Sequence, residues 1–281
     1  MEKVSVIIAN YNYDIWLMEA IKSVEDQTYQ NIEIIVIDDA SENPKTKSIL
    51  KALRKEKNIK VHIFDKNQGI AKVRNFGGKI ATGKYLLFLD ADDFLAPNYI
   101  EKAMAIFQKD KNIGIVYCNV ILYDEKKQTI WQLPPFDLKE LLIRNHIHNS
   151  AIIKKELFLS TEGYDNSLSG LEDWDFWISV FEKNKNIIAY KIPEPLFYYR
   201  QKANSRQKKL QENDALYQQT INYIKNKHNN FYIEVLGHPR ELYIQIKKLE
   251  KKIYRLENSK SYKIGRFITK PFRFIKTIEN K

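Results

Sequence analysis

Three carboxylates stand within four residues directly after an apolar run of the chain. The run is Lys84–Leu89, and Asp90, Asp92 and Asp93 follow it. Like charges this close together are costly in a folded protein unless a cation compensates them. Carboxylate oxygens suit Mg²⁺ or Mn²⁺, which typically bind substrate phosphates as well. The pattern predicts a divalent-metal site that neutralises a diphosphate leaving group. The alternative is a solvated acidic turn that caps a helix starting near Pro97.

A second acidic cluster lies roughly 80 residues further on, at the start of a predicted helix, Glu172–Phe181. Transfer of a group to a hydroxyl needs a base near the reacting carbon to accept the hydroxyl proton. Asp173 is the candidate base. Glu172 and Trp174 are candidates for binding a sugar or acceptor, because indole faces can pack on sugar rings. The alternative is that these acids only stabilise the positive end of the helix dipole.

Acidic and aromatic residues also follow two earlier apolar runs. Asp38 and Asp39 end the second run, where a carboxylate can accept hydrogen bonds from a nucleobase or from ribose hydroxyls. The alternative is an N-cap for a helix starting near Pro44. Tyr11 follows the first run and is placed to stack on a base, although a lone loop tyrosine more often serves packing. These residues are candidates for nucleotide binding.

A glycine and two cations open a later helix. Gly69 offers a flexible turn with free N–H groups, and Lys72 and Arg74 follow it on the helix. Such a helix start binds phosphate well. The alternative is that the two cations are ordinary exposed helix residues. Neither the dinucleotide glycine fingerprint nor a P-loop motif occurs in the sequence.

The elements that must position these residues alternate between strand and helix in the first half of the chain. Such alternation predicts an α/β fold with a mainly parallel sheet flanked by helices, and ligands at the carboxyl ends of its strands. The predicted strands are Val4–Ala9, Ile32–Ile37, Lys60–Phe64 and Lys84–Leu89, and the predicted helices are Asp14–Asp26, Lys45–Lys57 and Ile70–Ala81.

In the second half of the chain, the sequence predicts shorter strands and helices, followed by a helical segment rich in basic residues. Pro193 and Pro195 are expected to interrupt the chain before a strand at Leu196–Arg200. We therefore expect a catalytic domain over residues 1–205, with a nucleotide-binding half at about 1–110 and an acceptor half at about 111–205. Residues 206–281 are expected to form a helical, basic C-terminal extension.

The net charge of +11 is concentrated in this extension. Residues 240–281 hold 13 Lys and Arg against 4 Glu, whereas the rest of the chain is nearly neutral. A nucleic-acid-binding protein would carry basic residues on its folded domain as well. We therefore expect that this chain does not bind nucleic acid. The single cysteine, Cys118, allows no intrachain disulfide and fits a reducing cytoplasm.

The extension contains two patterned segments. The first is an a/d seam of about two heptads, which predicts either a homodimer or docking on the catalytic domain. The second interleaves apolar and basic residues, which predicts peripheral attachment to the inner face of the cytoplasmic membrane, with docking on the body as the alternative. The seam is Leu242, Ile246, Leu249, Ile253 and Leu256; the second segment has Ile264, Phe267, Ile268, Phe272, Ile275 and Ile278 between Lys263, Arg266, Lys270, Arg273 and Lys276.

The chain resembles the family 2 glycosyltransferases, which are inverting enzymes with the GT-A (Rossmann-like) fold. The resemblance covers about residues 1–200 and falls, in order, on VSVIIANYN, SVEDQTYQNIEIIVIDDAS, NQGIAKVRNFGGKIATGKYLLFLDADD, GYDNSL, LEDWDFWIS and LFYYR. It implies that Asp39, with Asp38 beside it, binds the nucleotide base, usually uracil, and that Tyr11 stacks on this base.

The resemblance also implies roles for the two acidic clusters. Asp90 and Asp92 match the DxD motif that contacts ribose and metal, with Asp93 adjacent, and Asp173 matches the general base. The family's mechanism is a single in-line displacement that inverts the anomeric centre. One departure concerns the metal: many relatives carry a histidine two residues beyond the Tyr-Arg pair, where this chain has Lys202. Lys202 could bind phosphate directly, which leaves any third protein ligand of the metal unassigned.

The sequence thus predicts a metal-assisted glycosyltransferase that moves a hexosyl or N-acetylhexosaminyl group from a UDP-sugar to a glycan or lipid-linked acceptor. The expected pathway is bacterial surface polysaccharide or glycolipid synthesis. One alternative is an inactive, membrane-attached sugar-binding or scaffold subunit. Another is a sugar-phosphate nucleotidyltransferase, which would need a glycine-rich basic loop where this chain has Asn10-Tyr11-Asn12.

Overall fold

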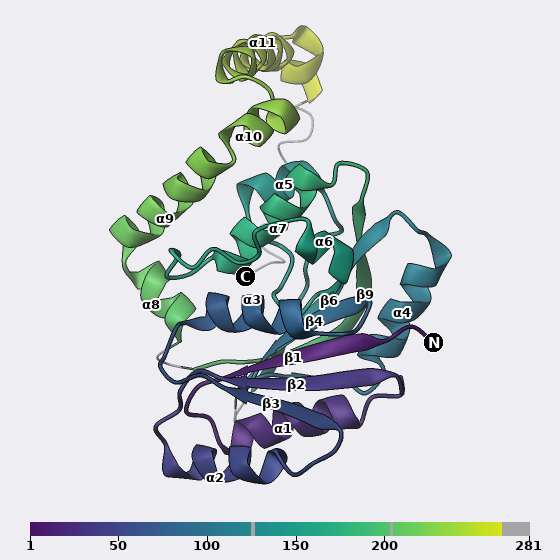
Figure 1. Ribbon diagram of the computed structural model, residues 1–281. Helices are drawn as coiled ribbons and strands as arrows, with labels where there is room; N and C mark the ends of the chain where they lie inside the picture. Colours follow the sequence, from purple (N-terminus) through teal and green to yellow (C-terminus); the bar gives the residue numbers. More distant parts are fainter. Residues whose placement is uncertain (125–126, 203–204, 266–281) are drawn as a thin grey trace. The chain divides into compact units, whose positions relative to one another are not determined.

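The structure is a computed structural model that describes residues 1–124, 127–202 and 205–265. The chain forms two compact units, residues 1–229 and 230–281, which are described separately. The first unit contains a nine-stranded sheet in the order β3-β2-β1-β4-β8-β6-β9-β5, with β7 paired to β6 (Figure 1).

Four parallel strands form the N-terminal part of this sheet, in the order β3-β2-β1-β4. Three of them, β1, β2 and β4, are almost completely buried, as expected for parallel strands covered by helices on both faces. The predicted mainly parallel sheet is confirmed. The bounds are β1 (Val4–Asn10), β2 (Ile32–Asp38), β3 (Ile59–Ile63) and β4 (Tyr85–Asp90).

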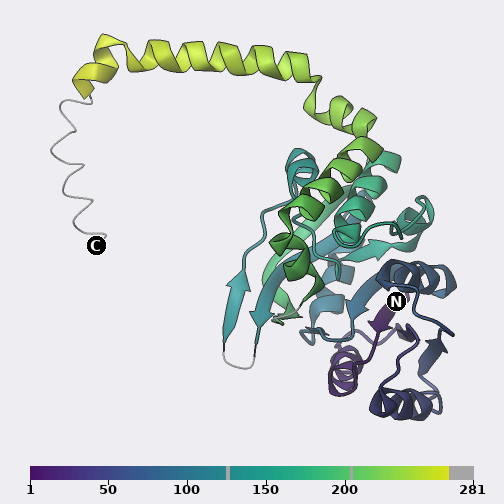
Figure 2. The same cartoon turned by 90° about the vertical axis from the view of Figure 1, so that its left-hand side faces the viewer.

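Helices cover both faces of the parallel strands. α1 and α2 lie together on one side, and α3 lies on the other, in both views (Figures 1 and 2). α3 packs closely because two glycines face its neighbours. A Cβ on Gly77 would come within 2.3 Å of Ile7 Cγ2, and one on Gly78 within 2.5 Å of the Phe158 ring. The helices of this part are α1 (Ile15–Glu25), α2 (Pro44–Leu53), α3 (Ile70–Ile80) and α4 (Tyr99–Lys109).

The sheet continues with strands of mixed direction. β8 runs antiparallel to both β4 and β6, whereas β6 and β9 are parallel to each other. β5 and β7 are short antiparallel additions to β9 and β6. The bounds are β5 (Phe94–Leu95), β6 (Ile113–Tyr123), β7 (Gln128–Trp131), β8 (Ile152–Lys154) and β9 (Ile188–Arg200).

The expected interruption at the two prolines is wrong. β9 runs through Pro193 and Pro195 to its end at Arg200. The register against β6 shifts on both sides of Asn119, and the side-chain amide of Asn119 donates a hydrogen bond to the Pro193 carbonyl at 2.5 Å. A bulge leaves positions without ladder hydrogen bonds, so prolines are tolerated there.

Helix α9 extends the first unit beyond residue 205 and contacts α7. The Nε2 of His228 lies 3.0 Å from Asp175 Oδ1, and the ammonium of Lys227 lies 2.7 Å from Asp175 Oδ2. Because these contacts join the end of α9 to α7, the compact unit ends at residue 229. The division at 205 stays a prediction about function. The bounds are α5 (Leu138–Ile143), α6 (Lys155–Leu159), α7 (Glu172–Lys183), α8 (Arg206–Glu212) and α9 (Asp214–Lys227).

The second unit is helical. α10 (Asn229–Leu236) leads into it. α11 (Pro239–Glu257) has a proline in its first turn, and the His238 side chain caps it by accepting a hydrogen bond from the backbone N–H of Arg240. Within residues 1–124, 127–202 and 205–265, no helix is long and apolar enough to cross a membrane. Of the apolar and basic residues named for the predicted membrane-binding segment, Lys263 and Ile264 belong to the described residues, and the others lie outside them.

Candidate active site

A cleft of about 560 Å³ lies at the carboxyl ends of β1, β2 and β4 in the first unit. Its size is typical of sites that take small-molecule ligands. The cleft is lined by residues of both acidic clusters and of the loops after β1 and β2, among them Tyr11, Asp39, Asp90, Asp92 and Asp173. This is where a doubly wound sheet is expected to bind its ligand.

The first acidic cluster is formed by the turn that ends β4. The backbone N–H of Asp93 donates to the Asp90 carbonyl at 3.0 Å, which folds the chain back on itself. As a result, one carboxylate oxygen from each of Asp90, Asp92 and Asp93 lies within 4.8 Å of the others. This spacing fits a single divalent cation. The three acids therefore form one cluster, and its role as a metal site stays a prediction.

Cations and donors surround this cluster. The Arg74 guanidinium lies 2.7 Å from Asp90 Oδ1, and the backbone N–H of Arg200 donates to Asp93 Oδ1 at 2.9 Å. The ammonium of Lys202 contacts Asp92 Oδ2. Burial, and then the adjacent carboxylates, still raise the pKa values of Asp92 and Asp93 above their ordinary value. Further positive charge would therefore stabilise the ionised cluster, as a divalent cation would.

The second acidic cluster stands at the first turn of α7. Asp173 Oδ1 accepts a hydrogen bond from the backbone N–H of Trp174 at 2.9 Å, and Oδ2 accepts one from the Asn145 amide at 2.9 Å. Burial and the neighbouring Glu172 carboxylate raise the pKa of Asp173 to about 6. A carboxylate with this pKa is ionised at neutral pH and remains a stronger base than an exposed aspartate.

Arg74 joins the two clusters. Its side chain is buried, and its second guanidinium nitrogen lies 2.9 Å from Glu172 Oε1. Arg206 from α8 contacts the same carboxylate oxygen. Burial opposes ionisation of Glu172, but Arg74 and Arg206 outweigh it and lower the pKa of Glu172. A single guanidinium thus ties Asp90 at the end of β4 to the start of α7.

The loops after β1 and β2 form the far wall of the cleft. Asp39 accepts hydrogen bonds from the backbone N–H groups of Gln68 at 2.7 Å and Gly69 at 2.9 Å, which fixes the loop before α3. Tyr11 also lines the cleft and is 42% exposed, so its ring is free to meet a ligand. Both residues line the cleft, and their role in nucleotide binding stays a prediction.

Three predicted residues are placed differently. Asp38 is buried and accepts hydrogen bonds from Asn10 Nδ2 at 2.7 Å and Ser41 N at 2.8 Å, so it joins the loops instead of facing the cleft. Lys72 is exposed and does not line the cleft, because two residues along a helix turn the side chain away from Arg74. Trp174 is only 3% exposed, and its indole N–H donates to the Leu141 carbonyl at 2.6 Å. The expectation that its ring packs on a sugar is wrong.

Three non-glycine residues beside the cleft adopt positive φ angles: Asn12 after β1 at 60°, Ala40 after β2 at 60° and Leu171 before α7 at 59°. This conformation costs about 1–3 kcal/mol for a residue with a side chain. Asn12 recovers part of it, because its Oδ1 accepts hydrogen bonds from Glu42 N and Asn43 N. Strained backbone that gathers around one cleft supports a functional role for it.

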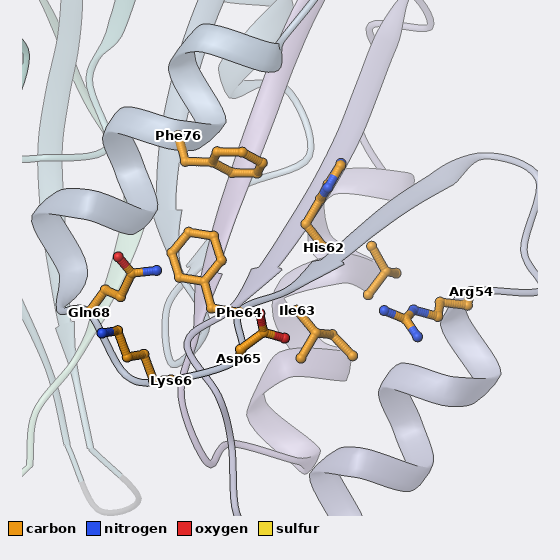
Figure 3. A pocket seen from close by; sticks show the side chains of 9 residues that line it. Arg54, His62, Ile63, Phe64, Asp65, Lys66, Gln68 and Phe76 are labelled. Atoms are coloured by element: carbon orange, nitrogen blue, oxygen red, sulfur yellow. The ribbon is translucent and has the colours of Figure 1, made fainter.

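A second hollow, of about 580 Å³, lies beside the edge strand β3 (Figure 3). The Phe76 ring meets His62 and Phe64 edge-on there, at centroid distances of 5.3 and 5.4 Å. Its lining includes one carboxylate, that of Asp65. The acidic clusters all belong to the other cleft, so we place the candidate active site there.

Comparison with known proteins assigns the chain to a family. The model of Glycosyl transferase family 2 matches residues 5–168, which is more than half of the chain. The chain belongs to this family. An uncharacterized glycosyltransferase of Haemophilus influenzae is 40% identical over 193 residues, which cover 68% of this chain and 76% of the relative. Another from the same organism is 28% identical over 271 residues, or 91% of this chain and 81% of the relative.

Solved structures show the same fold. Staphylococcus aureus TarS 1-349 in complex with UDP-GlcNAc aligns with a TM-score of 0.62 and 21% identity, over 73% of this chain and 60% of TarS. The mannosyltransferase PcManGT from Pyrobaculum calidifontis, in complex with GDP-Man and Mn²⁺, aligns with a TM-score of 0.56 and 19% identity, over 74% of this chain and 59% of that one. The predicted GT-A fold is confirmed for this family 2 glycosyltransferase.

Several contacts in the site of this glycosyltransferase cannot be read from its sequence. Asn145 belongs to a loop without a recognisable pattern, yet its amide orients Asp173. Arg200 lies within the motif LFYYR, but its contacts to Asp92 O and Asp93 Oδ1 depend on how β9 pairs. Arg206 belonged to the predicted extension and instead contacts Glu172. Each of these contacts joins segments that are distant in the sequence.

Proposed function

We propose that this protein transfers a sugar from a nucleoside-diphosphate donor, in particular a UDP-sugar, to an acceptor hydroxyl with inversion of the anomeric centre. One observation carries the proposal. A crowded carboxylate cluster that suits a divalent cation and a half-buried aspartate with a raised pKa line the same cleft, and Arg74 links the cluster to Glu172, the neighbour of that aspartate. Transfer from a diphosphate needs both a charge-compensated leaving group and a base.

The donor is proposed to lie along the wall formed by the loops after β1 and β2. Tyr11 stacks on the base, and Asp39 accepts hydrogen bonds from it, since both face the cleft. The fold similarity to TarS, whose structure holds UDP-GlcNAc, supports uridine and a hexosyl or N-acetylhexosaminyl group.

Asp92 and Asp93 are the proposed protein ligands of Mn²⁺ or Mg²⁺, with Asp90 beside them contacting ribose. When bound, the cation neutralises the negative charge that develops on the diphosphate. The Mn²⁺ in the structure of PcManGT supports a divalent cation in this fold. Arg74 holds Asp90 in place through the ion pair at 2.7 Å.

Asp173 is the proposed general base. The acceptor oxygen attacks the anomeric carbon, the bond from this carbon to the diphosphate oxygen breaks, and the acceptor proton passes to Asp173. Asn145 and the Trp174 N–H hold the carboxylate in one orientation, and Glu172 keeps Arg74 and Arg206 at its side. Because attack comes from the side opposite the leaving group, the anomeric configuration inverts.

The proposal is tested by incubating the protein with a panel of nucleotide sugars and measuring metal-dependent release of nucleoside diphosphate. We expect Asp92→Asn and Asp173→Asn to lose this activity, and the matched Asp65→Asn, which alters only the second hollow, to retain it. Nucleotide-sugar binding without turnover would indicate the sugar-binding subunit instead. Production of pyrophosphate from a nucleoside triphosphate would indicate a nucleotidyltransferase.

We further propose that the basic segment from Lys263 onward attaches the enzyme to the inner face of the cytoplasmic membrane, where it builds surface polysaccharide or glycolipid. The interleaved cations and apolar residues of the sequence support this proposal. Flotation with anionic vesicles should recover the full chain but not a chain that ends at Asn258, which keeps α11. Equal recovery of the two chains would contradict membrane attachment.

A further inference from the structure

Lys202 lines the cleft and contacts Asp92, one of the two proposed metal ligands. Its ammonium contacts Asp92 Oδ2 and the Tyr13 hydroxyl, and lies 4.6 Å from the Tyr13 ring centre and 5.8 Å from the Trp16 ring centre. Asp90 and Asp93 are engaged by other groups, Arg74 and the Arg200 N–H. Lys202 therefore forms the ion pair that compensates the charge of Asp92.

An ammonium and a divalent cation cannot share one carboxylate edge without strong repulsion. A lysine, however, is a compact charge on a flexible stem, and it binds phosphate readily. Lys202 comes from the chain just after β9 and lines the same cleft as the acidic cluster, so a diphosphate near Asp92 lies within reach of a change in its side-chain rotamers.

We propose that Lys202 is a built-in counter-cation, which holds Asp92 while the cleft is empty and moves to the donor diphosphate when a divalent cation takes its place. This inference rests on the proposed function. It predicts positive linkage between metal and nucleotide: each binds more tightly when the other is present, because the nucleotide gives Lys202 a second partner.

The test measures Mn²⁺ binding by the electron paramagnetic resonance signal of the free ion, for the full chain with and without UDP. Without UDP, Lys202→Met should bind Mn²⁺ at least about tenfold more tightly than wild type, because the competing charge is gone. With Mn²⁺ saturating, the same variant should bind UDP more weakly in calorimetry. Lys208→Met removes the same charge from α8, outside the cleft lining, and should match wild type.

Equal Mn²⁺ affinity of Lys202→Met and wild type without UDP would overturn the proposal and leave Lys202 a structural ion pair. Asp92→Asn separates this failure from failure of the proposed metal site. If Asp92→Asn binds Mn²⁺ as wild type does, the metal site itself is wrong, and the role of Lys202 falls with it.

A second inference concerns α11 and rests on a different observation. Ile246, Leu249, Ile253 and Leu256 are each more than half exposed, and none of the residues of α11 is buried. Figure 2 shows α11 as one continuous helix. A solvated helix that carries a row of Ile and Leu is poorly stabilised by itself.

The residue types at the seam specify its partner. With Leu242 at the first d position, the a positions are Ile246 and Ile253, and the d positions are all Leu. Ile at a with Leu at d favours a parallel two-stranded coiled coil. In this register Lys252 occupies a g position and Glu257 the following e position, so they face each other across a parallel dimer. An antiparallel pair would instead bring glutamates at e positions together.

We infer that α11 pairs with α11 of a second copy of this chain, in parallel. Pairing of about two heptads is weak, so the full chain should dimerise reversibly with a Kd on the order of micromolar in sedimentation equilibrium. Leu249→Asp should abolish the dimer. Ile244→Asp is the matched control, because Ile244 is an exposed apolar residue of the same helix outside the seam.

Charge exchange tests the orientation. Lys252→Glu and Glu257→Lys should each weaken the dimer about tenfold, and the double variant should restore it, because the g–e′ attraction returns with reversed sign. A chain that stays monomeric up to about 100 µM would overturn the inference, and docking on its own catalytic unit or on a membrane would then account for the seam. Failure of the double variant to restore the dimer would exclude the parallel arrangement.

Discussion

The two acidic clusters of the cleft contain the same chemical groups but differ in what neutralises them. Asp90, Asp92 and Asp93 crowd within 4.8 Å, and cationic side chains contact Asp90 and Asp92. Asp173 instead accepts hydrogen bonds from two neutral donors, the Asn145 amide and the Trp174 N–H. Glu172 beside it contacts the guanidinium groups of Arg74 and Arg206.

This difference separates the roles of neighbouring carboxylates. The guanidinium groups lower the pKa of Glu172, whereas burial and Glu172 raise the pKa of Asp173 to about 6. Two adjacent acids whose pKa values are pushed apart are a common arrangement where one of them exchanges protons. The placement of the cations, more than the positions of the acids in the sequence, supports the proposed base on α7 and the proposed cation site at the end of β4.

Asp173→Asn tests the assignment of the base and should have the largest effect. Removing a general base typically lowers kcat by about 10²–10⁴-fold. The affinity for UDP should stay near that of wild type, since Asp173 is not placed along the nucleotide wall. Steady-state kinetics and calorimetry with UDP check the two expectations, and a large loss of UDP affinity would contradict the separation of roles.

Arg74→Met breaks the link between the clusters and should mainly reduce stability. The substitution leaves Asp90 and Glu172 without their shared buried cation, which should lower the free energy of unfolding by about 3–5 kcal/mol. Chemical unfolding followed by tryptophan fluorescence measures it. Arg54→Met, at an exposed residue, should stay within about 0.5 kcal/mol of wild type; similar losses in both variants would show that Arg74 makes no special link.

The dependence of activity on pH tests whether Asp173 of the second cluster is the base. Because the base must be ionised, kcat/KM should rise with pH through about 6 and level off above it. Asn145→Ala removes a donor that stabilises the charged form of Asp173, so its pKa rises further. The inflection should then shift upward by about one unit. An unchanged inflection with lower kcat would indicate that Asn145 acts only through structure.

The smallest effects are expected for two aromatic residues, Tyr11 in the cleft wall and Trp174 in the core. Tyr11→Ala should weaken UDP binding about tenfold without loss of stability, because the Tyr11 ring is exposed in the cleft. Trp174→Phe should do the reverse, leaving UDP affinity intact while costing about 1–3 kcal/mol for the unsatisfied Leu141 carbonyl. Calorimetry with UDP and chemical unfolding, applied to both variants, check the contrast. Loss of UDP affinity in Trp174→Phe would show that Trp174 contributes to ligand binding after all.

Several features of the fold and site are predictable from the sequence because they are local. The alternation of buried strands and helices predicts the parallel sheet, and the carboxylates directly after β4 must meet at its carboxyl edge. The direction of a side chain on a helix is also local. Lys72 and Arg74 are two residues apart, so the sequence already indicates that their side chains point in different directions. Trp174 was less accessible to such reasoning, because its burial depends on α5 packing against α7.

By itself, the order of residues determines which acids this glycosyltransferase carries, at which strand and helix ends they stand, and that its first half forms a parallel α/β sheet. Only the tertiary structure decides which of these acids have cations beside them, and this supports the proposal that Asp173 is the base. The contact of Arg74 with Glu172 spans 98 residues, and that of Arg200 with Asp93 spans 107. The charge of a carboxylate depends on cations brought to it through space, and no local pattern encodes which distant cation arrives.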